Sequence, residues 1–150
     1  WNGNREKRIP QIRDYKKKNK EVLRIKRKEY RKSFHGRIVR ALATSRRKAR
    51  GKGIVEKFNI IDRRIIIQIF SSQCANCGIH EQVLINNTGN FLIMDHHRPL
   101  SSGNARTINN AVPLCPDCNA KKRDKTPEEF YTSEKLDWIK KNLELIEKGE

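Results

Sequence analysis

The four cysteines of this 150-residue chain occur as two CxxC pairs, Cys74/Cys77 and Cys115/Cys118. Two such pairs are typical of a tetrahedral zinc site with four thiolate ligands rather than of two disulfides. Thirty-seven residues separate the pairs, which is a longer spacing than most zinc ribbons have. The sequence therefore predicts one structural zinc ion, with a substantial piece of chain between the two halves of its site.

A second group of reactive side chains lies in the segments MDHHRPLSSGN (94–104) and NNAVPLCPDCNAKK (109–122). Asp95, His96 and Asn119 are the residue types that metal-assisted hydrolysis of a phosphodiester needs. A carboxylate and an amide oxygen suit a hard divalent ion such as Mg2+, which acts as a Lewis acid on the phosphate. A neutral imidazole, with an ordinary pKa near about 6.5, accepts a proton from the attacking water at neutral pH.

The order of these motifs, CxxCG, then DHxxPLSxG, then NxVPLCxxCNxxK, resembles the HNH endonuclease family with its ββα-metal fold. The resemblance covers about Gln73 to Lys125. It implies that His96 is the general base, and that Asp95 and Asn119 hold the catalytic ion. Asn110 matches the position that braces the loop between the strands, and the four cysteines match the structural zinc of many family members.

Two features depart from the family pattern. His97 stands where an apolar residue commonly follows the catalytic histidine, so two imidazoles compete for the role of base. Neighbouring side chains of a strand face opposite ways, so at most one imidazole should face the metal, and His96 is favoured over His97 as the catalytic residue. Ser102-Gly103-Asn104 replaces the common double glycine, which leaves the catalytic positions unchanged.

Two other kinds of zinc protein share some of these features. A non-catalytic nucleic-acid-binding module of a larger assembly would use the same thiolates, with Asp95 in a turn and Asn119 as a helix cap, and this alternative stays open. A base deaminase requires H-x-E and P-C-x-x-C motifs. The nearest pieces here, His80-Glu81 and Pro113-Leu114-Cys115, do not fit them.

The net charge of +17 lies in the first third of the chain. Residues 1–53 hold 21 Lys and Arg against 4 Asp and Glu, while residues 54–150 hold 13 of each kind. Such an arm releases counterions when it binds a phosphate backbone, so DNA is the expected partner. A membrane surface is a less favoured partner, because the arm has no clear apolar face of the kind that anchors a helix in a bilayer. The predicted phosphate contacts are Arg24, Arg27, Arg31, Arg37, Arg98, Lys121 and Lys122.

The surrounding pattern predicts an α+β protein with two parts. Residues 1–53 are expected to be a mainly helical DNA-binding arm, broken near Gly36 and ended by a linker at 49–53. Residues 54–150 are expected to be the nuclease domain. It should open with a helix that has Phe58, Ile61, Ile65 and Ile69 on one face, followed by a β-hairpin from 82–85 and 90–95 around a Gly-bearing turn.

Helices are predicted for the rest of the chain. A short helix should carry residues 119–125, Thr126-Pro127 opens the next, and Ser133 opens a last one that ends at Gly149. The apolar stripe of this last helix comprises Leu136, Ile139, Leu143 and Ile146.

Taken together, the sequence predicts a metal-dependent DNA endonuclease with a structural zinc and a separate Mg2+ or similar divalent ion. One such site cuts one strand, so double-strand cleavage needs sequential cuts, a homodimer or a larger nucleoprotein assembly. No run of about 18 apolar residues is present for a membrane span, and no apolar segment follows the basic start as in a secretory signal. A cytoplasmic, nucleic-acid-associated protein is therefore expected.

Overall fold

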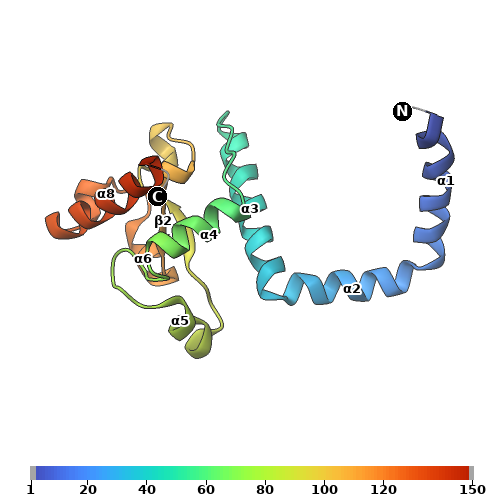
Figure 1. Cartoon of the computed structure of the whole chain (residues 1–150), viewed down its shortest axis with the longest axis horizontal. Coiled ribbons are helices and arrows are strands. Elements are labelled where there is room, and N and C mark those ends of the chain that lie inside the picture. The colour runs from blue at the N-terminus through green and yellow to red at the C-terminus, as the bar shows by residue number, and fades with distance from the viewer. Residues whose placement is uncertain (1–2, 149–150) are drawn as a thin grey trace. The chain divides into compact units, whose positions relative to one another are not determined.

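The computed structural model describes residues 3–148 and divides the chain into two compact units, Trp1–Ala41 and Leu42–Glu150 (Figure 1). The first unit is helical in its described residues except at Asn19 and Ser33. It comprises α1 (Gly3–Lys18), α2 (Lys20–Lys32) and the first part of α3 (Phe34–Gly51). The prediction of a helical arm is confirmed.

The break predicted near Gly36 lies at Ser33, whose backbone is extended and whose hydroxyl donates to the Tyr30 carbonyl at 2.7 Å. Gly36 is nonetheless needed there, because a Cβ on it would stand 1.8 Å from the Tyr30 carbonyl oxygen. No residue of α2 is buried. Ile9, Ile12, Val22 and Ile25 are also exposed, so α1 and α2 gain little from apolar burial.

The second half of α3 belongs to the second unit. Ser45 Oγ donates to Glu56 Oε2 at 3.3 Å, and Arg46 Nε donates to the Phe58 carbonyl at 3.1 Å. A turn through Gly51-Lys52-Gly53, with a positive φ of 74° at Gly53, reverses the chain between these contacts. The linker predicted over 49–53 is therefore helical as far as Gly51, and the chain turns only at Lys52-Gly53. The observed division of the chain falls earlier, after Ala41.

Helix α4 (Ile60–Ile69) begins at a capping box formed by Asn59 and Asp62. The helix predicted here is confirmed, but its predicted apolar face is wrong. Ile66 is fully buried, whereas Ile61 is 63% exposed and Ile65 is 38% exposed. The capping box starts the helix after Phe58, so Phe58 is not part of the helix. Its burial therefore does not determine which side chains of α4 face the core.

The predicted hairpin is also wrong, because residues 82–85 are helical. Helix α5 (Glu81–Thr88) begins at His80, whose Nδ1 accepts from the Gln82 N–H at 3.1 Å, and ends at Gly89, which has a φ of 67°. Buried Glu81 forms an ion pair with Arg63 of α4 and accepts from the Leu92 N–H at 2.9 Å. These tertiary contacts fix the segment as a helix packed beside α4.

The sheet instead pairs two strands that lie on either side of a loop. Strand β1 (Ile93–His96) runs antiparallel to β2 (Ala111–Leu114), with Asp95 opposite Val112 and His96 opposite Ala111. The loop between the strands holds the short 3-10 turns η1 (Leu100–Ser102) and η2 (Ile108–Asn110). Helix α6 (Pro116–Lys122) follows β2 and packs on both strands.

The predicted C-terminal helices are present. Helix α7 (Pro127–Phe130) begins at a capping box of Thr126 and Glu129, and α8 (Ser133–Lys148) buries Ile139 completely and sets Trp138 against Phe70. The predicted stop at Gly149 lies outside the described residues. Among the residues described, no helix has the length and apolar content of a membrane span.

Candidate active site and metal centre

The Sγ atoms of Cys74, Cys77, Cys115 and Cys118 all lie within 4.8 Å of one another. Tetrahedral zinc with Zn–S bonds of about 2.3 Å requires sulfur atoms about 3.8 Å apart, and the Cys77 and Cys115 sulfurs are 3.7 Å apart. Three N–H groups point at the sulfurs. The Cys115 N–H donates to Cys74 at 3.3 Å, the Cys118 N–H to Cys115 at 3.5 Å, and Asn76 Nδ2 to Cys118 at 3.3 Å. Such donors stabilise thiolates, so these residues fit a bound metal ion.

Local structure brings the two cysteine pairs together. Cys74 lies in a turn that is tied to the end of β2 by the Ala75 N–H, which donates to the Pro113 carbonyl at 2.8 Å. Cys115 is the N-cap of α6, with Pro116 at the first helical position. The cysteine cluster therefore joins this turn to the junction of β2 and α6. The prediction that all four cysteines share one site is confirmed.

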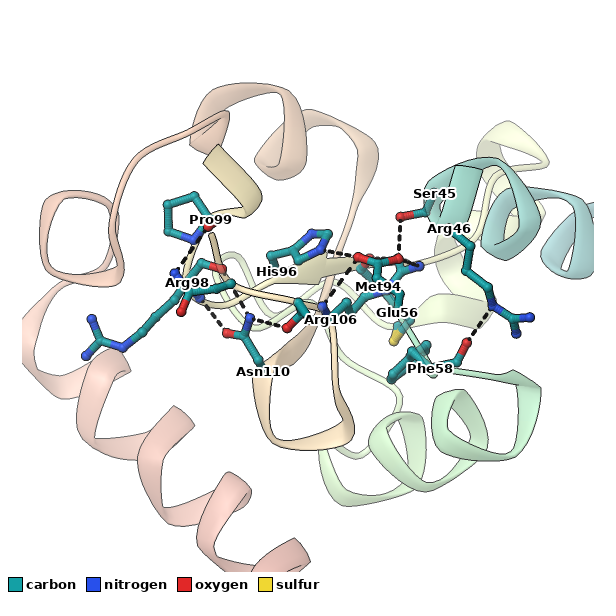
Figure 2. A network of polar contacts seen from close by, with 12 residues as sticks. Ser45, Arg46, Glu56, Phe58, Met94, His96, Arg98, Pro99, Arg106 and Asn110 are labelled. Atoms are coloured by element: carbon teal, nitrogen blue, oxygen red, sulfur yellow. Dashed lines mark hydrogen bonds and ion pairs between the residues drawn. The ribbon is translucent and has the colours of Figure 1, made fainter. Parts of the chain in front are cut away.

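His96, the last residue of β1, lies against a buried carboxylate that the sequence did not single out. Its Nε2 is 2.5 Å from Glu56 Oε1, and the Glu56 side chain is 0% exposed (Figure 2). Burial lowers the pKa of His96, while the hydrogen bond and the charge of Glu56 act in the opposite direction. The net direction favours a neutral imidazole at neutral pH.

His97 has quite different surroundings. Its ring is stacked on that of Tyr131, with centroids 6.1 Å apart and an interplanar angle of 27°. Burial, with the charges of Lys122 and Arg98, lowers the pKa of His97 to about 4. The two neighbouring imidazoles thus face different groups, with His96 at the end of β1 and His97 in the bend that follows it.

Asp95 is paired with Lys122 of α6. Lys122 is only 1% exposed, and its Nζ lies 2.9 Å from Asp95 Oδ2 and donates to the His96 carbonyl at 2.7 Å. The sequence predicts Lys122 as a phosphate contact. Its side chain is instead buried and paired with Asp95, so it is not exposed to contact a phosphate. Its helical neighbour Lys121 is exposed.

Asn119 and Asn110 occupy defined places beside these residues. Asn119 is half-buried in the middle of α6, where its N–H donates to the Cys115 carbonyl at 2.9 Å. The Asn110 side chain accepts from the Arg98 N–H at 2.7 Å and donates to the Arg98 and Ala105 carbonyls at 3.2 and 3.0 Å (Figure 2). These are the contacts of a residue that closes the loop between β1 and β2.

The other predicted phosphate contacts are spread over both units. Arg98 is exposed, with Nη2 3.5 Å from Glu128 Oε1. In the first unit, Arg24 pairs with Glu21, and Arg37 is half-buried. Arg27 and Arg31 line a hollow of about 520 Å³ together with Lys20, Arg24, Lys28, Lys32 and Arg40.

Comparison with known proteins points to one family. Residues 74–125 match the HNH endonuclease family. The chain is 41% identical over 54 residues to the type IV methyl-directed restriction enzyme EcoKMcrA of Escherichia coli. The aligned stretch covers 36% of this chain and 20% of that enzyme. It is also 30% identical over 76 residues to YoqL of Bacillus subtilis, an SPbeta prophage-derived protein that is named as an HNH endonuclease. This alignment covers 49% of this chain and 33% of YoqL.

The chain thus spans a third or less of these relatives, and the likeness to EcoKMcrA concerns 54 residues. The matched stretch begins at Cys74, the first cysteine of the cluster, includes β1, β2 and α6, and ends beyond Lys122. The family match, the antiparallel pair followed by a helix and the clustered cysteines agree with one another, and they identify residues 74–125 as an HNH endonuclease domain.

Proposed function

We propose that this chain is a metal-dependent DNA endonuclease that hydrolyses phosphodiester bonds. The observation that carries the proposal is the junction of β1 and α6 within an HNH domain. There, a neutral imidazole, a carboxylate and an amide lie on elements that pack against each other. These are the groups needed to activate water and to hold an ion at a phosphate.

His96 takes the role of general base in this proposal. Its imidazole is kept neutral by burial, and it lies at the end of β1, next to Asp95. We assign a divalent ion such as Mg2+ to an oxygen of Asp95 and the amide oxygen of Asn119, because hard ions prefer oxygen ligands. Asp95 Oδ2 contacts Lys122, which leaves Oδ1 to hold the ion. When bound, the ion supplies Lewis-acid stabilisation of the scissile phosphate.

The four thiolates take a structural role, with zinc as the ion. They join the turn at Cys74 to the start of α6, and α6 carries Asn119. The ion would therefore fix how Asn119 faces Asp95 without reacting itself. DNA is the proposed substrate, held by the basic residues of α1, α2 and α3 and by exposed Arg98 and Lys121 near the site.

The decisive test is a supercoiled-plasmid assay with Mg2+ on the wild-type chain and two histidine variants. His96→Ala should lower the nicking rate by about 10²- to 10⁴-fold, the usual contribution of a general base, while zinc content and DNA binding stay unchanged. His97→Phe, which keeps an aromatic ring against Tyr131, should cleave normally. Cleavage that survives in His96→Ala and is lost in His97→Phe would move the base to His97.

A second arm of the test concerns the metals. EDTA should abolish nicking while one zinc ion per chain stays bound, and added Mg2+ should restore activity. A wild-type chain that binds DNA and zinc but never cleaves with any divalent ion would favour the non-catalytic nucleic-acid-binding module.

A further inference from the structure

Glu56 is a buried anion that the proposed chemistry does not use. It lies between α3 and α4, outside the matched residues 74–125, and its side chain is 0% exposed. A buried carboxylate costs several kcal/mol unless charges and hydrogen bonds compensate it. The groups that contact the Glu56 carboxylate must therefore compensate for its burial.

The two oxygens of Glu56 have different partners. Oε2 lies 3.2 Å from Arg106 Nη2 and 3.3 Å from Ser45 Oγ. Oε1 lies 2.5 Å from His96 Nε2 and 3.3 Å from the Arg106 N–H. Arg106 thus balances the charge, while Oε1 is directed at the imidazole (Figure 2).

The carboxylate is also held rigidly with respect to the strand that carries His96. Arg106 Nη1 donates to the Met94 carbonyl in β1 at 2.8 Å, and the Arg106 guanidinium lies 5.1 Å from the centre of the Phe58 ring. Arg106 is itself buried. Glu56 and His96 are therefore connected through Arg106 and β1 as well as directly.

We propose that Glu56 is a positioning residue for His96, accepting the Nε2–H so that the lone pair of Nδ1 faces the attacking water. This inference rests on the proposed nuclease function. A carboxylate that accepts one imidazole N–H fixes the tautomer and the ring orientation. When Nδ1 takes the proton of the water, the hydroxide oxygen bonds to phosphorus and the 3′ oxygen leaves. The imidazolium so formed is stabilised by the adjacent carboxylate.

The tautomer is measurable without any cleavage. The chain has four histidines, so long-range 1H–15N spectra of 15N-histidine-labelled, zinc-loaded protein at neutral pH, without Mg2+, resolve each ring. His96, assigned by its absence in His96→Ala, should carry its proton on Nε2. A proton on Nδ1, or rapid exchange between the two nitrogens, would overturn the proposal, and this measurement needs no Glu56 variant to fold.

The matched variants are Glu56→Gln and Ser45→Ala. In Glu56→Gln, Arg106 should attract the amide oxygen and turn the NH2 group toward His96, which favours the opposite tautomer. We expect at least a tenfold lower single-turnover rate at saturating protein, a fraction of the roughly 10²- to 10⁴-fold due to a general base. The protein concentration at half-maximal rate should be unchanged. Ser45→Ala removes a contact to the other oxygen and should cleave normally.

The outcomes separate the two proposals. A Glu56→Gln protein that cleaves at the wild-type rate, when His96→Ala does not, overturns the role of Glu56 alone. A His96→Ala protein that cleaves normally overturns the proposed base and with it the positioning role. A slower Glu56→Gln protein whose His96 proton has moved from Nε2 to Nδ1 supports both.

Discussion

In α2, basic side chains such as Arg24 and Arg27 lie on a helix without a single buried residue. In the HNH domain, Lys122 and Arg106 are buried, and each binds one carboxylate and one backbone carbonyl. If the arm binds phosphates as proposed, that binding depends on the sum of its charges, to which many positions contribute alike. The site depends on single contacts that no neighbour replaces. This difference decides where a substitution is tolerated and where it is not.

The largest difference between the two regions should follow removal of zinc. Structural zinc contributes about 10–16 kcal/mol in small zinc domains, so Cys115→Ala, or stripping with a strong chelator, should abolish the cooperative thermal unfolding of residues 42–148. DNA binding at low salt should persist, because the arm holds its charge without the domain. Calorimetry and a binding titration on the same sample measure both effects.

Reloading the stripped chain with zinc is the control, and it should restore the transition. A domain that still unfolds cooperatively after verified loss of zinc would show that its apolar core, not the ion, holds the thiolate cluster together.

Lys121 and Lys122 are neighbours in α6, but Lys121 is exposed and Lys122 is buried. Lys122→Met should lower the free energy of unfolding by about 3 kcal/mol, because Asp95 and the His96 carbonyl lose a buried cation. Exposed Lys121→Met should change it by less than about 0.5 kcal/mol. Urea unfolding of the zinc-loaded proteins measures both. Equal effects at the two positions would contradict the pairing of Lys122 with Asp95.

These two lysines also show what the sequence could and could not predict. Both follow the second CxxC pair, and nothing in the sequence tells a buried lysine from an exposed one. The clustering of the four cysteines was predictable because metal coordination demands given residue types at given spacings. The roles of Asp95, His96 and Asn119 follow from the order of the motifs and stay a prediction.

Tertiary contacts account for what the sequence could not predict. The sequence pattern predicts a strand at residues 82–85, but they lie in helix α5, whose first residue, Glu81, forms an ion pair with Arg63, 18 residues earlier. Glu56 lies 40 residues from His96 in a short linker between helices. A single glutamate there has no motif, so only the fold reveals its contact with the imidazole.

The arm can be removed at the boundary between the two units, which lies after Ala41. Residues 1–41 hold 16 Lys and Arg against 4 Asp and Glu. Their deletion should weaken DNA binding about a hundredfold at low salt, or about 2.7 kcal/mol, and reduce the dependence of log K on log salt by several units. Fluorescence anisotropy with a labelled duplex measures both quantities.

The cut is placed after Ala41 because a deletion to residue 50 would also remove Ser45 and Arg46, which bind Glu56 and Phe58. The shorter deletion should keep the zinc content and the unfolding temperature of the domain. An unchanged salt dependence would mean that the arm does not bind the phosphate backbone.

The smallest effects should come from the same substitution made once in each region. Arg106→Lys keeps the charge but loses the planar group that binds Met94 and Glu56 together. It should cost about 1–3 kcal/mol of unfolding free energy and slow cleavage by displacing Glu56. Arg27→Lys, on the exposed arm, should leave stability, affinity and salt dependence unchanged, because a phosphate responds to the charge. A loss of affinity in Arg27→Lys would indicate that the arm also binds DNA through specific guanidinium contacts.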